Sequence, residues 1–249
     1  MGRPVYDDIG RTYGTTRRED PRIAAAIHGA LGDARTVVNV GAGTGNYEPT
    51  DRAVVAVEPS EAMLVQRAGR PATAVRGVAE ALPFPDGAVE AALAVLTVHH
   101  WQDQPRGLAE LRRVAPRQVV FFFEPEQTRH FWALEYFAAA ADVPSERNAA
   151  GERVLREHLD VREIRHVPVP RDCTDGFGAA FWARPEAYLD PAVQAGQSWL
   201  ALLPPGVLAE CSAHLADDLA SGEWDRRHGH LRTLDELDAG YRIAIAGQG

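Results

Sequence analysis

Three glycines at alternate positions are the residues in this sequence that point most directly to chemistry. Gly41, Gly43 and Gly45 follow a short Val-rich run, and a second such run ends in the carboxylate of Glu58. Glycine lets a loop turn sharply and lets the backbone approach a ligand closely, because it has no Cβ. A carboxylate at the end of the next strand supplies paired acceptors for a ribose diol. Together these residues predict a nucleoside-binding pocket.

The spacing of the glycines distinguishes between nucleosides. A dinucleotide fingerprint reads G-x-G-x-x-G, with the pyrophosphate at the start of the helix that follows. This sequence reads G-x-G-x-G, with Asn46 where the last glycine of that fingerprint would stand. Pro49 limits the element after the loop to a short helix, and no G-K-[ST] follows. These features disfavour NAD and ATP.

The elements that position these residues are predicted from short apolar runs bounded by turn signals. Runs of this kind are typical of neighbouring strands buried on both faces of a parallel sheet. A helix is expected at 21–31, and another after Asp103 as its N-cap, with Pro105 in the first turn. We expect strands at 37–40, 54–58, 89–98, 119–123, 161–169 and 241–246.

Three stretches of the sequence, the glycine loop and two later ones, resemble motifs of a single protein family. Residues 40–45 resemble motif I of the class I S-adenosylmethionine-dependent methyltransferases, small-molecule type. Residues 77–86 resemble the stretch that borders the adenine in that family, and residues 96–101 resemble its crossing from the fourth strand into the next helix. The resemblance covers Tyr6 to Glu124 and resumes weakly at the C-terminus.

The resemblance implies a doubly wound α/β fold, in which a mostly parallel seven-stranded sheet carries a helical lid inserted near the C-terminus. We expect one methyltransferase domain over residues 1–249. Within it, 1–34 would cover the cofactor, 35–125 would bind it, 126–239 would form substrate-side helices and a lid that include strand six, and 240–249 would be the last strand.

The implied cofactor is S-adenosyl-L-methionine, with S-adenosyl-L-homocysteine as product and no metal. In the family the glycine loop lies beside the methionine part, and the acid matching Glu58 holds both ribose hydroxyls. Val78 stands where an aspartate commonly binds the adenine amino group, so that contact is missing, supplied by backbone or moved to Glu80. The expected cofactor contacts are Tyr13, Arg17, Asn39, Gly41, Ala42, Gly43, Gly45, Glu58, Pro59, Met63, Val78, Ala79, Glu80, Leu96 and Thr97.

Methyl transfer from a sulfonium is a one-step displacement, so catalysis is mainly alignment of the reacting atoms. If the acceptor is a hydroxyl or an ammonium, a base must take its proton, and histidine suits neutral pH. His100, and after it His99, are the candidate bases or acceptor-orienting residues, with Glu124 as a further alternative. The two histidines could equally cap the helix or bond to backbone.

Aromatic residues concentrate after Glu124 and predict a hydrophobic or aromatic acceptor. Phe177 and Phe181 are four apart and would share a helix face. The alternative is that most of these rings form ordinary core. The expected substrate contacts are Tyr6, Trp101, Trp132, Phe177, Phe181 and Trp182.

Composition excludes several classes of partner. A net charge of −9 on 249 residues disfavours nucleic acid, and no apolar run is long enough to span a membrane. We expect a cytoplasmic enzyme of secondary metabolism, a monomer or homodimer, that acts on a small-molecule acceptor. The alternatives are an NAD(P)-linked oxidoreductase and a non-methylating enzyme, such as a cyclase, that retains the cofactor on the same fold.

Overall fold

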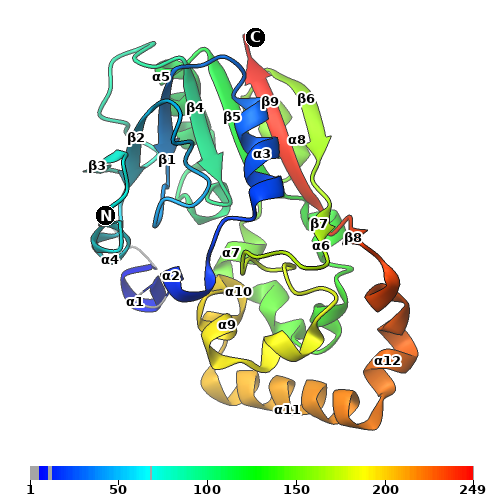
Figure 1. Cartoon of the computed structure of the whole chain (residues 1–249). Helices are drawn as coiled ribbons and strands as arrows, with labels where there is room; N and C mark the ends of the chain where they lie inside the picture. The colour runs from blue at the N-terminus through cyan, green and yellow to red at the C-terminus, as the bar shows by residue number, and fades with distance from the viewer. Residues whose placement is uncertain (1–5, 11–12, 68, 249) are drawn as a thin grey trace.

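Seven strands form one sheet in the order β3-β2-β1-β4-β5-β9-β6 (Figure 1). The structure is a computed structural model that describes residues 6–10, 13–67 and 69–248. Strand β9 runs antiparallel to β5 and β6, and the other pairs are parallel. This arrangement confirms the predicted fold class. The strands are β1 (Thr36–Val40), β2 (Ala53–Glu58), β3 (Thr73–Arg76), β4 (Ala91–Val95), β5 (Arg117–Phe123), β6 (Val161–His166) and β9 (Tyr241–Gly247), and β7 (Val169–Pro170) pairs separately with β8 (Glu236–Leu237).

Most helices in the described part of the chain are short. The α-helices are α1 (Tyr6–Ile9), α2 (Tyr13–Thr16), α3 (Pro21–Ala30), α4 (Glu61–Val65), α5 (Gln104–Val114), α6 (Pro125–Thr128), α7 (Pro144–Arg147), α8 (Glu152–His158), α9 (Pro191–Ala195), α10 (Ser198–Ala201), α11 (Pro205–Ser221) and α12 (Glu223–His228). The 3₁₀ helices are η2 (Val98–His100), η3 (Trp132–Glu135), η4 (Ala138–Asp142), η5 (Pro185–Leu189) and η6 (Gly229–Thr233).

Side chains of the central strands alternate between two cores, one on each face of the sheet. Val37 and Phe121 lie in the core on the α3 side, and their neighbours Val38 and Phe122 lie in the core under α5 and α8. Because successive side chains point to opposite faces, a strand covered on both sides reads as a continuous apolar run. This explains why the central strands could be predicted from sequence.

The caps of α3 and α5 explain where these helices begin. The Asp20 carboxylate accepts from Arg22 N at 3.0 Å and Pro21 follows it, while Asp103 accepts from Arg106 N at 3.0 Å. A side-chain acceptor at the N-cap satisfies a free N–H of the first turn. The predicted N-cap at Asp103 is therefore confirmed.

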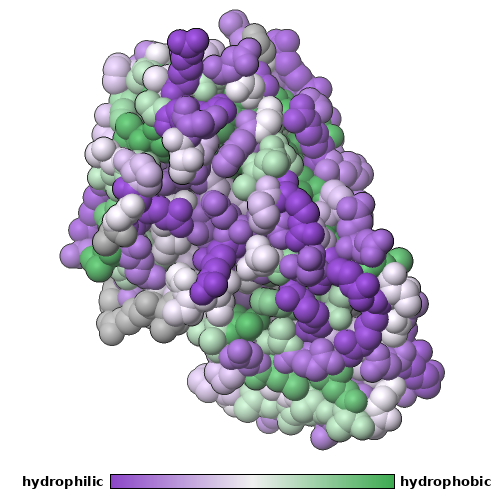
Figure 2. Space-filling view, viewed as in Figure 1, coloured by the Kyte–Doolittle hydropathy of each residue, from purple (hydrophilic) through white to green (hydrophobic). Residues whose placement is uncertain are grey.

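The segment between β5 and β9 folds largely into a helical lobe at the carboxyl ends of the parallel strands (Figure 1). The long helix α11 forms the far end of this lobe and stops at Gly222, which has a left-handed φ of 78°. Figure 2 shows a mostly hydrophilic surface over the sheet, and apolar residues gathered at the lower end of the helical lobe. The lobe occupies the position predicted for a lid.

Three local predictions need correction. Strand four ends at Val95 rather than Val98, because Leu96 adopts a positive φ of 47°. Strand six ends at His166, because Pro168 has no N–H to continue the ladder. Phe177 and Phe181 lie in a turn-rich segment and do not share a helix.

Candidate active site

The glycine loop after β1 lines a large cavity at the carboxyl edge of the sheet. Gly41, Gly43 and Gly45 have positive φ values of 67°, 53° and 90°, a region that side chains with a Cβ rarely adopt. A Cβ on Gly41 would fall 2.0 Å from Thr97 Oγ1. The backbone N–H groups of Gly41 and Ala42 donate to Val57 O at 2.8 and 3.1 Å. The loop is thereby held against the ends of β2 and β4.

Glu58 closes β2 beside this loop. Its carboxylate accepts from Gly43 N at 2.7 Å and from Ser60 N at 2.8 Å, and it lines the cavity. Burial raises the pKa of the Glu58 carboxyl, although these two hydrogen bonds oppose the rise. The side chain is 5% exposed. A carboxylate fixed in this way keeps acceptor capacity for a hydroxyl pair in the cavity.

A buried polar cluster supports the loop from below. Arg67 Nη2 lies 2.8 Å from Glu48 Oε2, both side chains are 4% exposed, and Asn39 Nδ2 donates to Glu48 Oε1 at 2.9 Å. Arg67 Nη1 also donates to Gly43 O at 3.2 Å. A Cβ on Gly45 would meet Glu48 Oε2 at 2.9 Å. Gly45 therefore packs on this cluster and does not line the cavity. The other residues predicted to contact the cofactor all line it.

Asn39 provides a direct test of whether an S-adenosylmethionine-like group fits. Its side chain lines the cavity beside the glycine loop. The Oδ1 atom is buried, and no described residue donates a hydrogen bond to it. A buried acceptor of this kind requires a donor, because an unsatisfied one costs free energy. The ammonium of an amino-acid moiety would supply that donor, so the site fits the methionine end of the cofactor.

The N-terminal helices α1 and α2 cover the cavity. The rings of Tyr6 and Tyr13 pack edge to face with centroids 5.4 Å apart, and both line the cavity. Gln66, the C-cap of α4, holds this segment by donating to Gly10 O at 2.8 Å. Residues 1–5, 11 and 12 of the predicted covering segment lie outside the described part of the chain.

Arg17 occupies the predicted place at the cavity, but its donors are already engaged. Its Nε donates to Asp175 Oδ1 at 2.8 Å, and Nη1 donates to the Tyr13 hydroxyl. Tyr47 also donates to Asp175, at 2.8 Å. Arg17 was predicted as a cofactor contact, and it lines the cofactor-side cavity with its guanidinium paired to Asp175 and Tyr13.

The same cavity also carries the residues expected near adenine. Val78, Ala79 and Glu80 line it, and Glu80 Oε1 accepts from the backbone N–H groups of Gln102 and Asp103 at 2.8 and 3.1 Å. Trp101, predicted as a substrate contact, lines this cavity and not the second one. Its ring packs closely over Gly107, where a Cβ would lie 2.5 Å from Trp101 Cε3.

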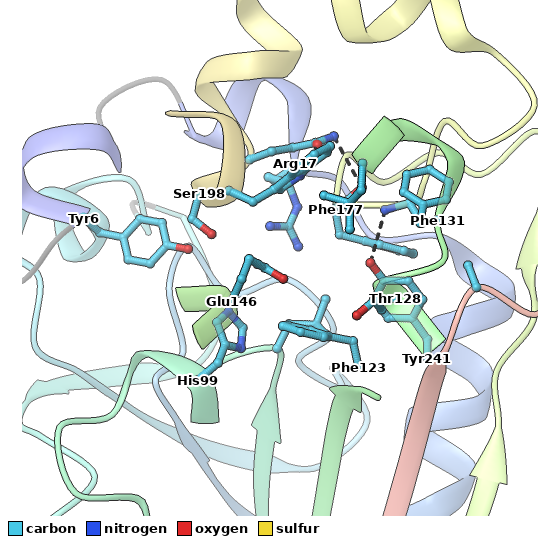
Figure 3. Close-up of a pocket in the computed structure, with 17 residues that line it drawn as sticks. Tyr6, Arg17, His99, Phe123, Thr128, Phe131, Glu146, Phe177, Ser198 and Tyr241 are labelled. Atoms are coloured by element: carbon cyan, nitrogen blue, oxygen red, sulfur yellow. Dashed lines mark hydrogen bonds between the residues drawn. The ribbon is translucent and has the colours of Figure 1, made fainter. Parts of the chain in front are cut away.

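A second cavity adjoins the first. The two share Tyr6, Arg17 and Leu96 in their linings. Figure 3 shows the Tyr6 and Ser198 hydroxyls and the Glu146 carboxylate directed into this space. The aromatic side chains lining it are Phe123, Phe131, Phe177, Trp199 and Tyr241. We name it the acceptor cavity, and we name the first the cofactor cavity.

The two histidines divide between the cavities. His99 lines the acceptor cavity, and His100 lines the cofactor cavity, where its Nε2 lies 2.9 Å from the Tyr6 hydroxyl. Burial and the charge of Arg17 lower the pKa of His100 to about 4. Burial, His100 and Arg17 lower the pKa of His99 well below its usual range. Both imidazoles are therefore neutral at physiological pH, and His100 is a weak base.

Glu146 on α7 is the acidic side chain of the acceptor cavity, and sequence reasoning missed it. Burial raises the pKa of its carboxyl to about 7. The sequence Pro144-Ser145-Glu146-Arg147 has the composition of a solvent-exposed helical turn. Only the packing of α7 beside η2 turns its carboxylate toward the cavity, so the residue carried no sequence signal.

Four other predicted residues have different roles. Trp132 and Trp182 are buried in the core, where Trp132 Nε1 donates to Trp182 O at 2.9 Å and Trp182 Nε1 donates to Val169 O at 2.9 Å. Phe181 lies under the Arg184 guanidinium, and neither cavity includes these three residues. Glu124 accepts from Glu152 N at 2.8 Å at the start of α8. Their surroundings depend on tertiary packing, which residue type alone does not encode.

Two features are absent from the described residues. Residues 6–10, 13–67 and 69–248 contain no group of three or more His, Cys, Asp or Glu side chains placed to hold a metal ion. None of the helices in these ranges has the length and apolar character needed to cross a bilayer.

A sheet whose carboxyl edge carries a glycine loop, an acid after the next strand and an adjoining aromatic cavity defines the methyltransferase class of α/β proteins. Residues 38–123 match the family model described as "Methyltransferase domain". A crystal structure from Anabaena variabilis ATCC 29413, provisionally described as a methyltransferase from an antibiotic biosynthesis pathway, is 31% identical, with a TM-score of 0.85 over 93% of this chain and 99% of that one. The chain belongs to the class I S-adenosylmethionine-dependent methyltransferases.

More distant structures share the fold. The [4+2]-cyclase SpnF is 15% identical, with a TM-score of 0.57 over 98% of this chain and 93% of that one. Geranyl diphosphate C-methyltransferase from Streptomyces coelicolor A3(2), in complex with Mg²⁺, geranyl diphosphate and S-adenosyl-L-homocysteine, is 14% identical, with a TM-score of 0.50 over 92% and 79%. Identities this low show the fold alone. A comparison with curated proteins gives no match.

Proposed function

We propose that the protein transfers the methyl group of S-adenosylmethionine to a small hydrophobic or aromatic metabolite by in-line displacement. The observation that carries this proposal is the meeting of the two cavities at Tyr6, Arg17 and Leu96. One cavity has the donors and acceptors that a nucleoside and an amino acid require, and the other is walled by aromatic rings. A nucleophile in the second cavity would face the reactive end of a molecule in the first.

The cofactor cavity has a separate group for each part of the molecule. Glu58 would hold the ribose hydroxyls, and Asn39 Oδ1 would accept from the ammonium of the methionine part. The wall formed by Val78, Ala79 and Trp101 would cover the adenine. When bound, the cofactor supplies an electrophilic methyl carbon on sulfur.

The chain itself supplies alignment and exclusion of water. Tyr6 closes the cofactor cavity from α1 and reaches His100 across it. Leu96, with its left-handed φ of 47°, stands at the junction of the cavities and lines both of them. Holding two reactants at contact distance in a closed site accounts for much of the acceleration of a displacement.

The decisive experiment has two parts. Incubation with S-adenosylmethionine and a panel of small aromatic and apolar acceptors should release S-adenosylhomocysteine, detected by mass spectrometry. A crystal structure with that product should place its sulfur at the junction formed by Tyr6 and Leu96. Tight cofactor binding without product release across the panel would instead favour a non-methylating activity such as cyclisation. A sulfur atom pointing away from the acceptor cavity would contradict the proposal.

A further inference from the structure

The Glu146 carboxylate lacks a counter-ion. It is the single acidic side chain among the residues that line the acceptor cavity. Within residues 6–10, 13–67 and 69–248, no hydrogen bond or ion pair reaches its carboxylate oxygens. The residue is half-buried, and carboxylates drawn out of water are normally paired or neutralised, because desolvation disfavours their charged form.

The position of Glu146 is fixed rather than incidental. Its helix α7 is anchored by the next residue, Asn148, whose Nδ2 donates to His99 O at 3.0 Å and to Trp101 O at 3.1 Å. These two bonds hold α7 against η2 and place Glu146 next to His99 in the cavity wall (Figure 3). A side chain that turned toward the cavity only by chance would not require these two Asn148 hydrogen bonds.

The other titratable groups of the cavity cannot neutralise Glu146. The groups that face it are Arg17, His99, Tyr6 and Tyr241. The Arg17 guanidinium is paired with Asp175 at 2.8 Å. His99 is neutral, and Tyr241 accepts from Ala179 N at 3.1 Å. The cavity therefore presents an uncompensated carboxylate.

The remaining walls favour a cation as well. Phe123, Phe131, Phe177 and Trp199 line the same cavity. The faces of aromatic rings attract a desolvated cation, with Trp the strongest. A carboxylate inside an aromatic enclosure is the arrangement that recognises an organic ammonium group.

We propose that the methyl acceptor is a primary or secondary amine whose ammonium group pairs with Glu146, and that Glu146 takes the proton which the nitrogen loses before it attacks. This inference rests on the proposed methyl transfer and names its acceptor class. It also moves the role of base from His100 and His99 to Glu146.

The step balances as follows. One N–H bond of the ammonium breaks and its proton goes to a Glu146 oxygen, which leaves a lone pair on nitrogen. That pair forms a bond to the methyl carbon, the carbon–sulfur bond breaks and its electron pair goes to sulfur. The products are a methylated ammonium and a neutral thioether. Glu146 then returns its proton to solvent.

Calorimetry on the S-adenosylhomocysteine complex tests the inference. The probes are 2-phenylethylamine and its neutral counterpart 2-phenylethanol, titrated at about pH 8. The amine should bind about tenfold tighter or better, as a charge-assisted pair would give. Glu146→Gln should abolish that preference, whereas Glu126→Gln, a change at an exposed position outside both cavities, should retain it.

Proton linkage gives a readout that a purely structural role would not produce. Near neutral pH, where part of the Glu146 population is protonated, binding of the amine should release protons. The observed heat should then vary with the ionisation enthalpy of the buffer, and this dependence should vanish in Glu146→Gln.

The outcomes separate the two proposals. Failure of S-adenosylhomocysteine to bind the wild-type protein would contradict the proposed function itself. Normal product binding without an amine preference overturns this inference alone, and so does failure of both probes to bind. An unchanged amine preference in Glu146→Gln overturns it as well.

Discussion

The Tyr6 hydroxyl lies 2.9 Å from Nε2 of His100, and this hydrogen bond joins helix α1 to the carboxyl end of the sheet. The bond crosses the cofactor cavity, whose lining includes both residues. Burial raises the pKa of Tyr6 above its usual value, so the hydroxyl keeps its proton. This hydrogen bond therefore holds the N-terminal segment against the cofactor cavity.

Removing this hydroxyl should weaken cofactor binding. Tyr6→Phe keeps the ring but loses the hydrogen bond, so we expect the affinity for S-adenosylhomocysteine to fall about threefold to tenfold, measured by calorimetry. Tyr188→Phe is the matched control, because Tyr188 lines neither cavity and its hydroxyl donates to Gly178 O at 2.7 Å, away from the cofactor cavity. Equal affinities for wild type and Tyr6→Phe would show that the Tyr6–His100 hydrogen bond does not support cofactor binding.

Gly41 and Gly43 should respond differently to alanine. Both have positive φ, but a Cβ on Gly41 meets Thr97 Oγ1 at 2.0 Å and one on Gly43 meets nothing within 4 Å. Gly43→Ala should cost about 1–2 kcal/mol of unfolding free energy, from the backbone alone. Gly41→Ala should cost at least about 1 kcal/mol more, because the clash adds strain. Urea unfolding measures the unfolding free energy of both variants. Equal losses of stability would show that the Thr97 side chain moves aside at little cost.

Breaking the Arg67–Glu48 pair should destabilise the protein strongly. Arg67→Met leaves a buried carboxylate beneath the glycine loop, which should cost about 3–5 kcal/mol. The Glu48→Gln, Arg67→Met double variant should lose less than the sum of the two single changes. Arg153→Ala, at an exposed pair 3.5 Å from Glu157, should change stability by less than about 0.5 kcal/mol. Additive losses in the double variant would argue against coupling of the two residues.

The unliganded protein should lose stability as pH rises through the titration of Glu146. The folded-state pKa of about 7 lies above the usual glutamate value of 4.5. The folded state thus binds the proton more tightly, and this contribution to stability is lost as pH rises towards 7. Glu146→Gln should match wild type near pH 4.5 and be more stable near pH 8, as thermal melts at each pH would show. Parallel profiles would mean that Glu146 does not titrate in this range.

The cofactor half of the site was predictable because its signals are local. The glycine loop, Glu58 and residues 78–80 each follow a strand end, and parallel strands bring their carboxyl ends to one edge. Of the residues predicted to contact the cofactor, Gly45 alone does not line the cavity. That exception arises because Gly45 packs on the buried Arg67–Glu48 pair, and Arg67 is distant from it in sequence.

The acceptor half was less predictable because its wall comes from short, separated helices. Trp132 and Trp182 have the residue type of a substrate contact, but their indole N–H groups bond to core backbone. Glu146 has the residue type of a surface position and lies in the cavity wall. Which of these side chains faces the cavity is decided by loop packing, which leaves no periodic pattern in the sequence.

Calorimetric titration with S-adenosylhomocysteine tests the central claim most directly. The wild-type protein should show saturable binding, and Glu58→Ala should weaken it at least about tenfold, since the acid held by Gly43 N and Ser60 N would no longer bind the ribose. Glu61→Ala, at an exposed neighbouring carboxylate, should bind as wild type does. Absence of heat with both S-adenosylmethionine and its demethylated product, or equal affinity in Glu58→Ala, would contradict the account.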